Sequence, residues 1–181
     1  MGSHISLLDR FDLAEYRLCR RLNRGVRHTS VRVFFKAASR LGDGVIWYVL
    51  MLALPVVYGS SGLRVALVML ASGAVGLAVY KLLKHTFVRE RPFIRHAGIS
   101  LAGAPLDRYS FPSGHTLHAV SFTWQACAAF PALAIVLVPL ALAIAASRVV
   151  LGLHYPTDVL VGALLGALFG FLGTALGGAS S

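Results

Sequence analysis

Three short clusters of polar residues interrupt a chain that is otherwise rich in apolar residues. The first runs from Lys84 to Pro92, the second from Phe111 to His115, and the third comprises Ser147 and Arg148, then His154 and Asp158. They contain cations of the kind that bind phosphate, together with imidazoles and a carboxylate of the kind that perform nucleophilic and acid–base catalysis. This combination predicts a site that handles a phosphoryl group.

Lys84, Arg91 and Arg148 are expected to converge as three cations on one bound phosphate. Without an anion, such a cluster is repulsive and costly at a membrane boundary. A phosphate dianion removes the repulsion, and the planar forks of the two arginines can each bind it with two hydrogen bonds. The competing interpretation is that these are cations of a cytoplasmic loop, or side chains that snorkel to the membrane surface.

Ser113 and Gly114 stand where a helix is expected to begin. A serine can cap the helix there, and a glycine lets a phosphate approach the backbone N–H groups closely. The N-terminus of a helix also attracts anions. We therefore assign both residues to phosphate binding, although Pro-Ser-Gly is by itself common turn chemistry.

His154, Asp158 and His115 have the residue types of a nucleophile, its orienting carboxylate and a general acid. Pro156 suits the first position of a helix, so Asp158 falls in the first turn and can reach back to one nitrogen of His154. That contact fixes the tautomer and leaves the other nitrogen free as the nucleophile. His115 is then the natural general acid for the leaving alkoxide. His118, one turn further along, either supports His115 or donates an interhelical hydrogen bond.

No metal ion and no cofactor are expected at this site. Its His and Asp residues do not have the spacing of zinc ligands, and three cations would repel a divalent ion. Glu90 and Asp107 can balance local charge, but neither is assigned to catalysis. Cys19 lies in a charged stretch and Cys127 in an apolar run, so no disulfide is expected.

The composition indicates that lipid surrounds most of the chain. Apolar residues make up 57% and charged residues 13%, against about 45–50% and about 25% in soluble domains. Five stretches are candidate spans, near residues 44–59, 63–83, 115–130, 132–148 and 156–177. We therefore predict an all-α fold, a polytopic membrane helical bundle with about five transmembrane helices. Because successive spans alternate in direction, the three polar clusters are expected at one membrane face.

The first 43 residues are expected to form an interfacial segment ahead of a transmembrane phosphatase domain at 44–181. Residues 5–24 and 31–41 have apolar side chains on one side of a helix and basic ones largely on the other, as in helices that lie in the membrane interface. The plainer interpretation is two ordinary surface helices. The net charge of +10 suits an anionic lipid or a phosphorylated substrate, and the extent of apolar sequence argues against nucleic acid as a partner.

The order and spacing of the three motifs resemble the signature of the type 2 phosphatidic acid phosphatases. The resemblance covers roughly residues 40–177, and the superfamily includes bacterial phosphatidylglycerophosphate and polyprenyl diphosphate phosphatases as well as vanadium haloperoxidases. The motifs are Lys84 with six residues before Arg91-Pro92, then Pro112-Ser113-Gly114-His115, then Ser147-Arg148 with five residues before His154 and three more before Asp158.

The resemblance implies that His154 forms a phosphohistidine intermediate, that Asp158 orients it and that His115 protonates the leaving group. It also implies the set of residues that hold the phosphate: Lys84, Arg91, Ser113, Gly114 and Arg148. Many relatives carry an additional first span, which the Arg-rich amphipathic stretch replaces here. The expected function is removal, without a metal, of a terminal phosphate from a membrane lipid such as phosphatidate, phosphatidylglycerophosphate or a polyprenyl phosphate or diphosphate.

Two other functions stay open. A lipid phosphotransferase would pass the phosphoryl group to another lipid through the same histidine intermediate. A transporter or scaffold that only binds anionic lipid would not need His154 and Asp158 beside His115, so that function is disfavoured. Haloperoxidase activity is disfavoured because those relatives are soluble.

The expected location is the inner membrane of a bacterium. With five spans, the N-terminal region and the site share one face, and that face carries every Lys and Arg except Arg64. An excess of Lys and Arg marks the cytoplasmic side. The charge distribution therefore favours a site that faces the cytoplasm, whereas the family resemblance implies the outer face.

Overall fold

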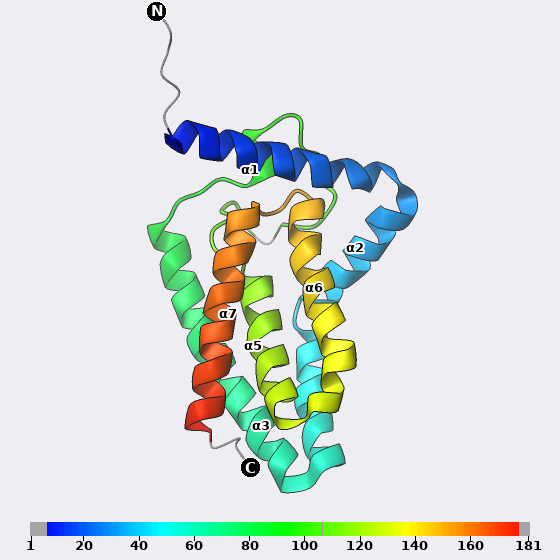
Figure 1. The fold of residues 1–181 in the computed structure, drawn as a ribbon, viewed down its shortest axis with the longest axis vertical. Coiled ribbons are helices and arrows are strands. Elements are labelled where there is room, and N and C mark those ends of the chain that lie inside the picture. The colour runs from blue at the N-terminus through cyan, green and yellow to red at the C-terminus, as the bar shows by residue number, and fades with distance from the viewer. Residues whose placement is uncertain (1–6, 106, 178–181) are drawn as a thin grey trace, which may run out of the picture.

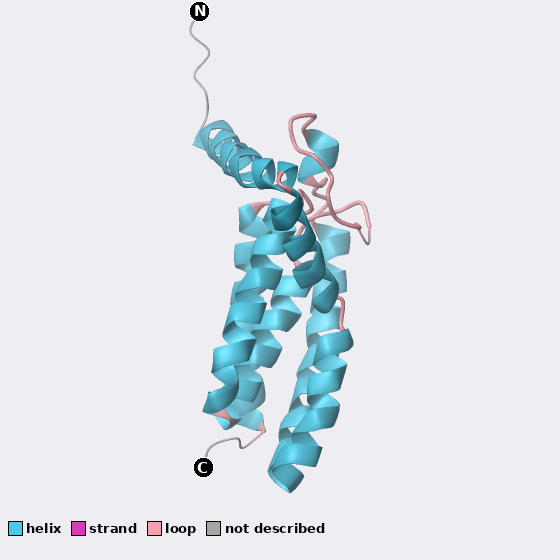
Figure 2. Ribbon diagram, turned by 90° about the vertical axis from the view of Figure 1, so that its right-hand side faces the viewer, coloured by secondary structure: helices cyan, strands magenta, loops and turns pink. Residues whose placement is uncertain are grey.

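Helices account for all the regular secondary structure in residues 7–105 and 107–177, the part of the chain that the computed structural model describes (Figures 1 and 2). This confirms the all-α prediction. In chain order the elements are α1 (Leu7–Asn23), the 3-10 turn η1 (Arg24–Arg27), α2 (Thr29–Leu41), α3 (Val45–Thr86), α4 (Pro92–Arg95), α5 (Gly114–Ala129), the 3-10 turn η2 (Pro131–Leu133), α6 (Ala134–Val150) and α7 (Pro156–Leu176).

The long element α3 is a helical hairpin rather than one straight helix. Its backbone leaves the helical region at Gly59, where φ is 59° and ψ is −135°, a conformation that favours glycine. The chain reverses there, at the bottom of Figure 1. The reversal falls at the end of the first predicted span, 44–59, so the two predicted spans on either side of it correspond to the two arms of α3.

α5 lies at the centre of the bundle, between α3, α6 and α7 (Figure 1). Its polar residues Thr123 and Gln125 are buried, as expected for polar groups that face the interior of a bundle. α7 packs closely against it, because a Cβ added to Gly166 would lie 2.4 Å from the carbonyl oxygen of Leu117. Small residues thus let these two helices approach each other closely.

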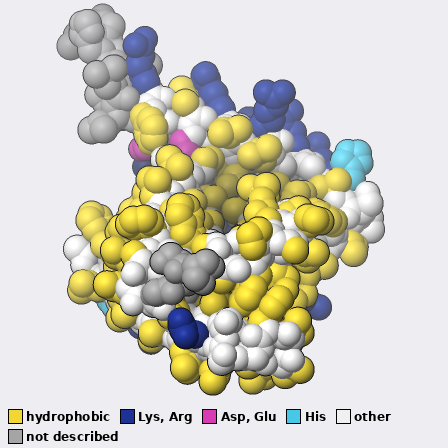
Figure 3. Space-filling view, turned by 60° about the horizontal axis from the view of Figure 1, so that its bottom comes forward, with side chains coloured by type: hydrophobic (Ala, Val, Ile, Leu, Met, Phe, Trp, Pro, Cys, Tyr) yellow, Lys and Arg dark blue, Asp and Glu magenta, His cyan; other side chains and the backbone are white. Residues whose placement is uncertain are grey.

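The outer surface of the bundle is suited to lipid. Three helical segments are long and apolar enough to cross a membrane, namely Val45–Thr86, Pro131–Val150 and Pro156–Leu176. Large apolar side chains on them point outward, among them Val56, Ile135 and Leu176, each at least 80% exposed. Figure 3 shows hydrophobic side chains over most of the visible face, with most of the visible Lys and Arg gathered at the edge farthest from the viewer. The predicted membrane bundle is confirmed.

The two N-terminal helices pack on the end of the bundle where the polar clusters lie. α1 crosses that end, and α2 runs down beside α6 (Figure 1). The buried side of α1 carries Glu15, Cys19 and Asn23, while Phe11 and Leu18 on the adjoining side stay exposed. The apolar stripe predicted for residues 5–24 is therefore left free for another environment, and residues 5 and 6 of that stretch lie outside the described part of the chain.

Candidate active site

The three polar clusters come together at the end of the bundle that α1 crosses. The loops that carry them gather there in Figure 2, and α5 begins well below the ends of α6 and α7 in Figure 1. The site is therefore recessed, with helix ends and the loop of residues 87–113 around it.

Arg91 and His154 are in direct contact. The Nη1 atom of Arg91 lies 3.2 Å from Nε2 of His154 and donates to the carbonyl oxygen of Leu153 at 2.9 Å. Arg91 is 1% exposed and His154 is 3% exposed. Because a guanidinium can only donate, this contact requires Nε2 of His154 to be the unprotonated, electron-rich nitrogen.

The other nitrogen of His154 faces Asp158. Its Nδ1 atom lies 3.7 Å from Oδ2 of Asp158, within ion-pair range but beyond hydrogen-bond length, and it has no hydrogen-bond partner among the described residues. Burial lowers the pKa of His154 to about 3; Asp158 acts against this shift, and the charges of Arg148 and Arg91 add to it. The free imidazole is thus neutral at physiological pH, as a nucleophile must be.

Asp158 is fixed by the start of α7 and by an arginine. Its Oδ2 atom accepts a hydrogen bond from the backbone N–H of Tyr155 at 2.8 Å, which caps α7, and its Oδ1 atom accepts one from Nη1 of Arg89 at 2.7 Å. Pro156 opens α7, as the sequence predicted. The carboxylate therefore has little freedom to turn away from His154.

Arg89 and Glu15 extend this arrangement to the N-terminal helix. Nη2 of Arg89 pairs with Oε2 of Glu15 at 2.5 Å, and the side chain of Glu15 is only 4% exposed. Glu15 also accepts hydrogen bonds from the backbone N–H (2.9 Å) and the hydroxyl of Thr157. Burial alone would lower the pKa of Arg89, but Asp158 and Glu15 outweigh it and raise that pKa above its usual value. α1 is therefore tied to the start of α7 by a charged bridge.

Lys84 and Arg91 share one carboxylate. Asp107 lies 2.6 Å from Nζ of Lys84 and 2.9 Å from Nη2 of Arg91, and Lys84 also donates to the hydroxyl of Tyr80 at 2.5 Å. Burial acts to raise the pKa of Asp107, but Lys84 and Arg91 outweigh it and hold that pKa below its usual range. Asp107 thus balances local charge, as expected from the sequence, and shows that these two cations can bind one anion together.

Arg148 approaches from α6. Its backbone carbonyl accepts hydrogen bonds from the N–H groups of Leu153 and His154, each at 3.0 Å, so it lies directly beside His154. Its buried guanidinium donates to the hydroxyl of Ser39 at 2.5 Å, and its Nε atom has no partner among the described residues. A buried donor with no partner is free for a ligand.

Ser113 and Gly114 lie at the start of α5. The backbone N–H of Ser113 donates to the carbonyl oxygen of Asp158 at 3.0 Å, which joins the starts of α5 and α7. Ser113 holds the N-cap position, but its hydroxyl bonds to Thr116 at 2.9 Å and makes no capping bond to the backbone. A Cβ on Gly114 would lie 3.0 Å from the ring of Tyr80, so the ring would have to shift slightly to admit a larger residue there.

His115 faces an acidic residue that the sequence reasoning did not single out. Its Nε2 atom lies 2.7 Å from Oδ1 of Asp43, which precedes α3. The positive charge of Arg148 acts on both His115 and His154. His118 lies 2.9 Å from the carbonyl oxygen of Gly114 and 3.3 Å from that of Gly73 on α3, so it makes an interhelical contact rather than one to His115.

Sequence reasoning missed three residues that contact predicted ones, namely Ser39, Asp43 and Arg89. It also missed Glu15, which holds Arg89. A usable signal existed for the acidic residues. The chain has only 7 Asp and Glu beside 17 Lys and Arg, so each acidic residue near a predicted membrane boundary is a candidate partner for a buried cation or histidine. Ser39 offered no comparable signal.

Two cavities meet at Asp43 and flank the site. One, of about 470 Å³, lies between the arms of α3 and the start of α5, and its lining includes Trp47, Met69 and Phe122 with His115 at its end. The other, of about 630 Å³, lies between α2 and residues 100–104. An apolar chain fits the first cavity and a polar group fits the second.

Among the described residues, no three His, Cys, Asp or Glu side chains gather in a way that could hold a metal ion. Cys19 and Cys127 are both free. Cys19 instead packs against the backbone of His154, with its Sγ atom 3.8 Å from the carbonyl oxygen of that residue. The absence of a metal from the reaction stays a prediction.

Comparisons with known proteins find similar chains. A family model described as the PAP2 superfamily matches residues 61–180. Decaprenylphosphoryl-5-phosphoribose phosphatase of Mycobacterium tuberculosis is 32% identical over 145 residues, which are 79% of this chain and 78% of the relative.

Two solved structures share the architecture. LpxE of Aquifex aeolicus superimposes with a TM-score of 0.74 and 28% identity, over 88% of this chain and 93% of that one. A PAP2 type phosphatidylglycerolphosphate phosphatase of Bacillus subtilis gives a TM-score of 0.73 and 23% identity, over 96% and 89% of the two chains. The second likeness bears on the fold alone.

Proposed function

The chain belongs to the PAP2 superfamily and is a phosphatase of that type, and on this premise we propose that it removes a terminal phosphate from a membrane lipid through a phosphohistidine at His154. One observation carries the proposal: Nε2 of His154 points at a phosphate-binding cation, Arg91, at 3.2 Å, while Nδ1 faces Asp158. A phosphoryl group held by Arg91 lies directly in front of the nucleophilic nitrogen.

In the first half of the reaction, Nε2 of His154 attacks phosphorus, and the bond from phosphorus to the lipid oxygen breaks. Nδ1 keeps its proton, and Asp158 stabilises the positive charge that develops on the ring. His115 gives a proton to the leaving alkoxide. Lys84, Arg91 and Arg148 neutralise the phosphoryl oxygens.

Ser113 and Gly114 complete the proposed phosphate site through the start of α5. The first N–H groups of a helix have no intrahelical acceptor and favour an anion. In the second half of the reaction, His115 takes a proton from water, the water oxygen attacks phosphorus, and the bond from phosphorus to Nε2 breaks. Inorganic phosphate leaves and His154 is neutral again.

We also propose that the substrate is a polyprenyl-linked or glycerolipid phosphate. The similar M. tuberculosis enzyme acts, by its name, on a decaprenyl-linked phosphosugar, and the apolar cavity beside His115 can take the first part of a lipid chain. The partners are then the lipid substrate and the bilayer. We propose residues 1–43 as the interfacial segment and 44–181 as the phosphatase domain, in a bacterial inner membrane, with the charge distribution favouring a cytoplasm-facing site.

Phosphate release from a panel of lipid phosphates in detergent, with EDTA present, tests the proposal. We expect His154→Ala to abolish release and His85→Ala, at an exposed histidine beyond the site, to leave it unchanged. An acid-labile, base-stable phosphoprotein should accumulate in rapidly quenched wild type and be absent from His154→Ala. Full activity in His154→Ala contradicts the mechanism, and loss of wild-type activity in EDTA contradicts the metal-free reaction. Transfer of the phosphoryl group to a second lipid instead of to water would identify a phosphotransferase.

A further inference from the structure

A cavity lined by cations opens beside the site, and the proposed mechanism does not use it. Its volume is about 630 Å³, and it lies between α2 and the loop of residues 100–104. Four basic residues line it: Arg27, Arg32, Lys36 and Arg40. We call this cavity, with those four residues, the basic pocket.

The charge of the basic pocket is unbalanced. Arg32, Lys36 and Arg40 follow one another at intervals of four residues on α2, so they lie on one face of the helix. All four cations are exposed, and none of them forms an ion pair with any of the residues that the structure describes. Asp43 lines the same cavity, but its carboxylate is engaged by His115 at 2.7 Å. Like charges this close repel one another unless an anion lies between them.

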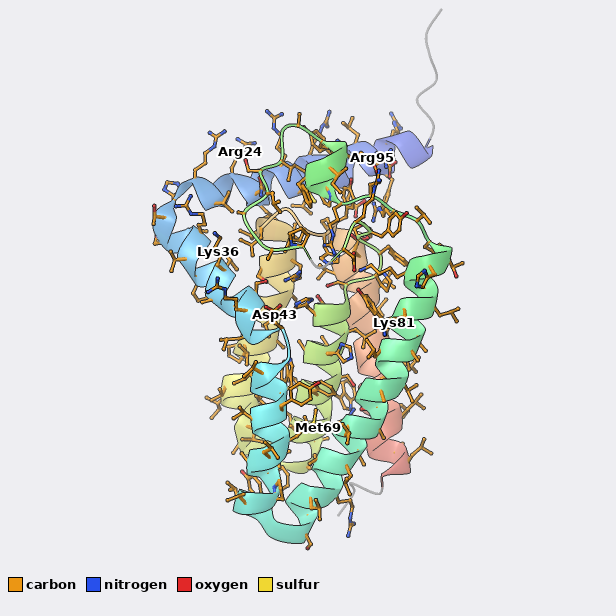
Figure 4. All side chains as sticks on the ribbon, turned by 180° about the vertical axis from the view of Figure 1, so that it is seen from behind. Arg24, Lys36, Asp43, Met69, Lys81 and Arg95 are labelled. Carbon is orange, nitrogen blue, oxygen red and sulfur yellow. The ribbon has the colours of Figure 1, made fainter. Side chains whose placement is uncertain are left out.

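The basic pocket is continuous with the catalytic groups. Ser39 lines it and accepts a hydrogen bond from Arg148, while Asp43 lines it and contacts His115. Figure 4 labels Lys36 on α2 and Asp43 at the end of that helix, where the chain turns into α3. Through Asp43 the pocket therefore reaches the side of the site where His115 meets the leaving group, and through Ser39 it reaches the phosphate-binding Arg148.

From this placement we infer that the basic pocket binds a second anionic group of the substrate, carried on the part of the molecule that leaves. The preferred substrates are then lipids whose terminal phosphate is attached to a further phosphate or to a phosphodiester-linked sugar. Singly phosphorylated lipids fill only the catalytic half of the site. The inference rests on the proposed function and adds the substrate class to it.

Anionic groups that fit the basic pocket have a second source besides the substrate. Anionic headgroups of the surrounding membrane could occupy the basic pocket and hold the enzyme at the surface without any role in substrate choice. If that is so, removal of the cations should lower the activity equally on every substrate, and only when anionic lipid is present. A substrate subsite predicts an effect on doubly anionic substrates alone, in a neutral detergent.

The experiment compares farnesyl diphosphate with farnesyl monophosphate in micelles of an uncharged detergent. The variant is Arg32→Gln with Lys36→Gln, and the matched control is Arg17→Gln with Arg21→Gln, which removes two exposed cations at the same spacing on α1. We expect kcat/KM for the diphosphate to fall about tenfold or more in the pocket variant, because charge-assisted hydrogen bonds are lost. Activity on the monophosphate should change less than about twofold, which also shows that the variant folds.

An equal loss on both substrates, or no loss on either, overturns the inference. So does a loss that appears only after anionic lipid is added to the micelles, because that result assigns the pocket to the bilayer. His154→Ala run in parallel separates the two proposals: its inactivity on both substrates supports the mechanism whatever the pocket variant does, and its activity refutes the mechanism alone.

Discussion

The two sides of this site are built differently. The nucleophile side, named after the role proposed for His154, consists of Arg91, His154 and Asp158, which are each 3% exposed or less. The leaving-group side consists of His115, Asp43 and the basic pocket, where the side chain of Asp43 is 51% exposed. The first side is a closed network of side chains and helix ends, and the second side opens onto two cavities.

The difference separates chemistry from substrate choice. Attack on phosphorus needs a neutral imidazole held at a fixed angle, and burial among ordered partners provides this before substrate arrives. The leaving group varies from lipid to lipid, so the side that receives it has to admit different shapes. A related enzyme could therefore change its substrate by altering α2 and the residues near 100–104 while it keeps the corner of α6 and α7.

Removal of His115, the proposed general acid, should give the largest effect and test the leaving-group side directly. We expect His115→Ala to lower kcat/KM for a lipid phosphate by about 10²- to 10⁴-fold, because a lipid alkoxide leaves poorly without a proton. The loss on p-nitrophenyl phosphate should be much smaller, because nitrophenolate leaves without protonation. Phosphate release and nitrophenol absorbance measure the two rates.

Asp43→Asn serves as the conservative companion, since it keeps the size of the residue that contacts His115. It should show the same dependence on the leaving group with a smaller loss. His118→Ala, which removes an interhelical contact, should affect both substrates equally. If His115→Ala lost as much activity on the aryl ester as on the lipid, His115 would belong to phosphate binding and the division between the two sides would be wrong.

Because the nucleophile side is closed, the free energy of unfolding should fall in acid. His154 has a pKa of about 3 in the folded protein, below about 6.5 for an exposed histidine. The unfolded chain therefore binds a proton between these values that the folded chain does not, so stability is lost as pH falls below about 6.5. Between pH 7 and pH 5 the loss from this group is about 2 kcal/mol. Melting in detergent at the two pH values measures it.

His154→Gln should remove that part of the pH dependence, while His85→Gln, at an exposed histidine, should leave it unchanged. A direct check is the ring nitrogen signals of His154 in selectively labelled protein, which should remain those of a neutral imidazole at pH 5. A titration near pH 6.5 would show that the nucleophile side is open to water in solution.

The fold and the contact between His154 and Asp158 were predictable because their signals are local. Pro156 and Asp158 show from spacing alone that a helix begins there, with a carboxylate one turn from His154. Apolar runs gave the membrane bundle, and Gly59 falls at the predicted end of the first span.

The partners of these residues were not predictable, because they come from parts of the chain far away in sequence. Glu15 reaches Thr157 across 142 residues, and Ser39 reaches Arg148 across 109. On α1 the periodic pattern identified an apolar stripe but not the side that packs on the bundle, since that side carries Glu15 and Asn23. Buried polar contacts of this kind follow from tertiary structure, which hydrophobic periodicity does not encode.

Glu15 allows the smallest and most specific test of the nucleophile side. Glu15→Gln keeps an acceptor for the backbone N–H of Thr157 but removes the charge that holds Arg89 against Asp158. We expect kcat to fall about five- to tenfold with KM little changed, because a small error in the orientation of His154 acts on the transition state and not on lipid binding. Steady-state kinetics on one lipid phosphate measures this split.

Asp12→Asn is the matched control, since Asp12 is an exposed carboxylate on the same helix whose contact with Arg95 is 3.9 Å long. It should leave both constants unchanged. A purely structural role for Glu15 would lower the melting temperature and the amount of active enzyme but leave kcat per folded molecule intact. That outcome would confine the nucleophile side to the three buried residues. A selective loss of kcat would instead make α1 part of the catalytic apparatus, because the helix then holds the carboxylate of Asp158 in place from outside the bundle.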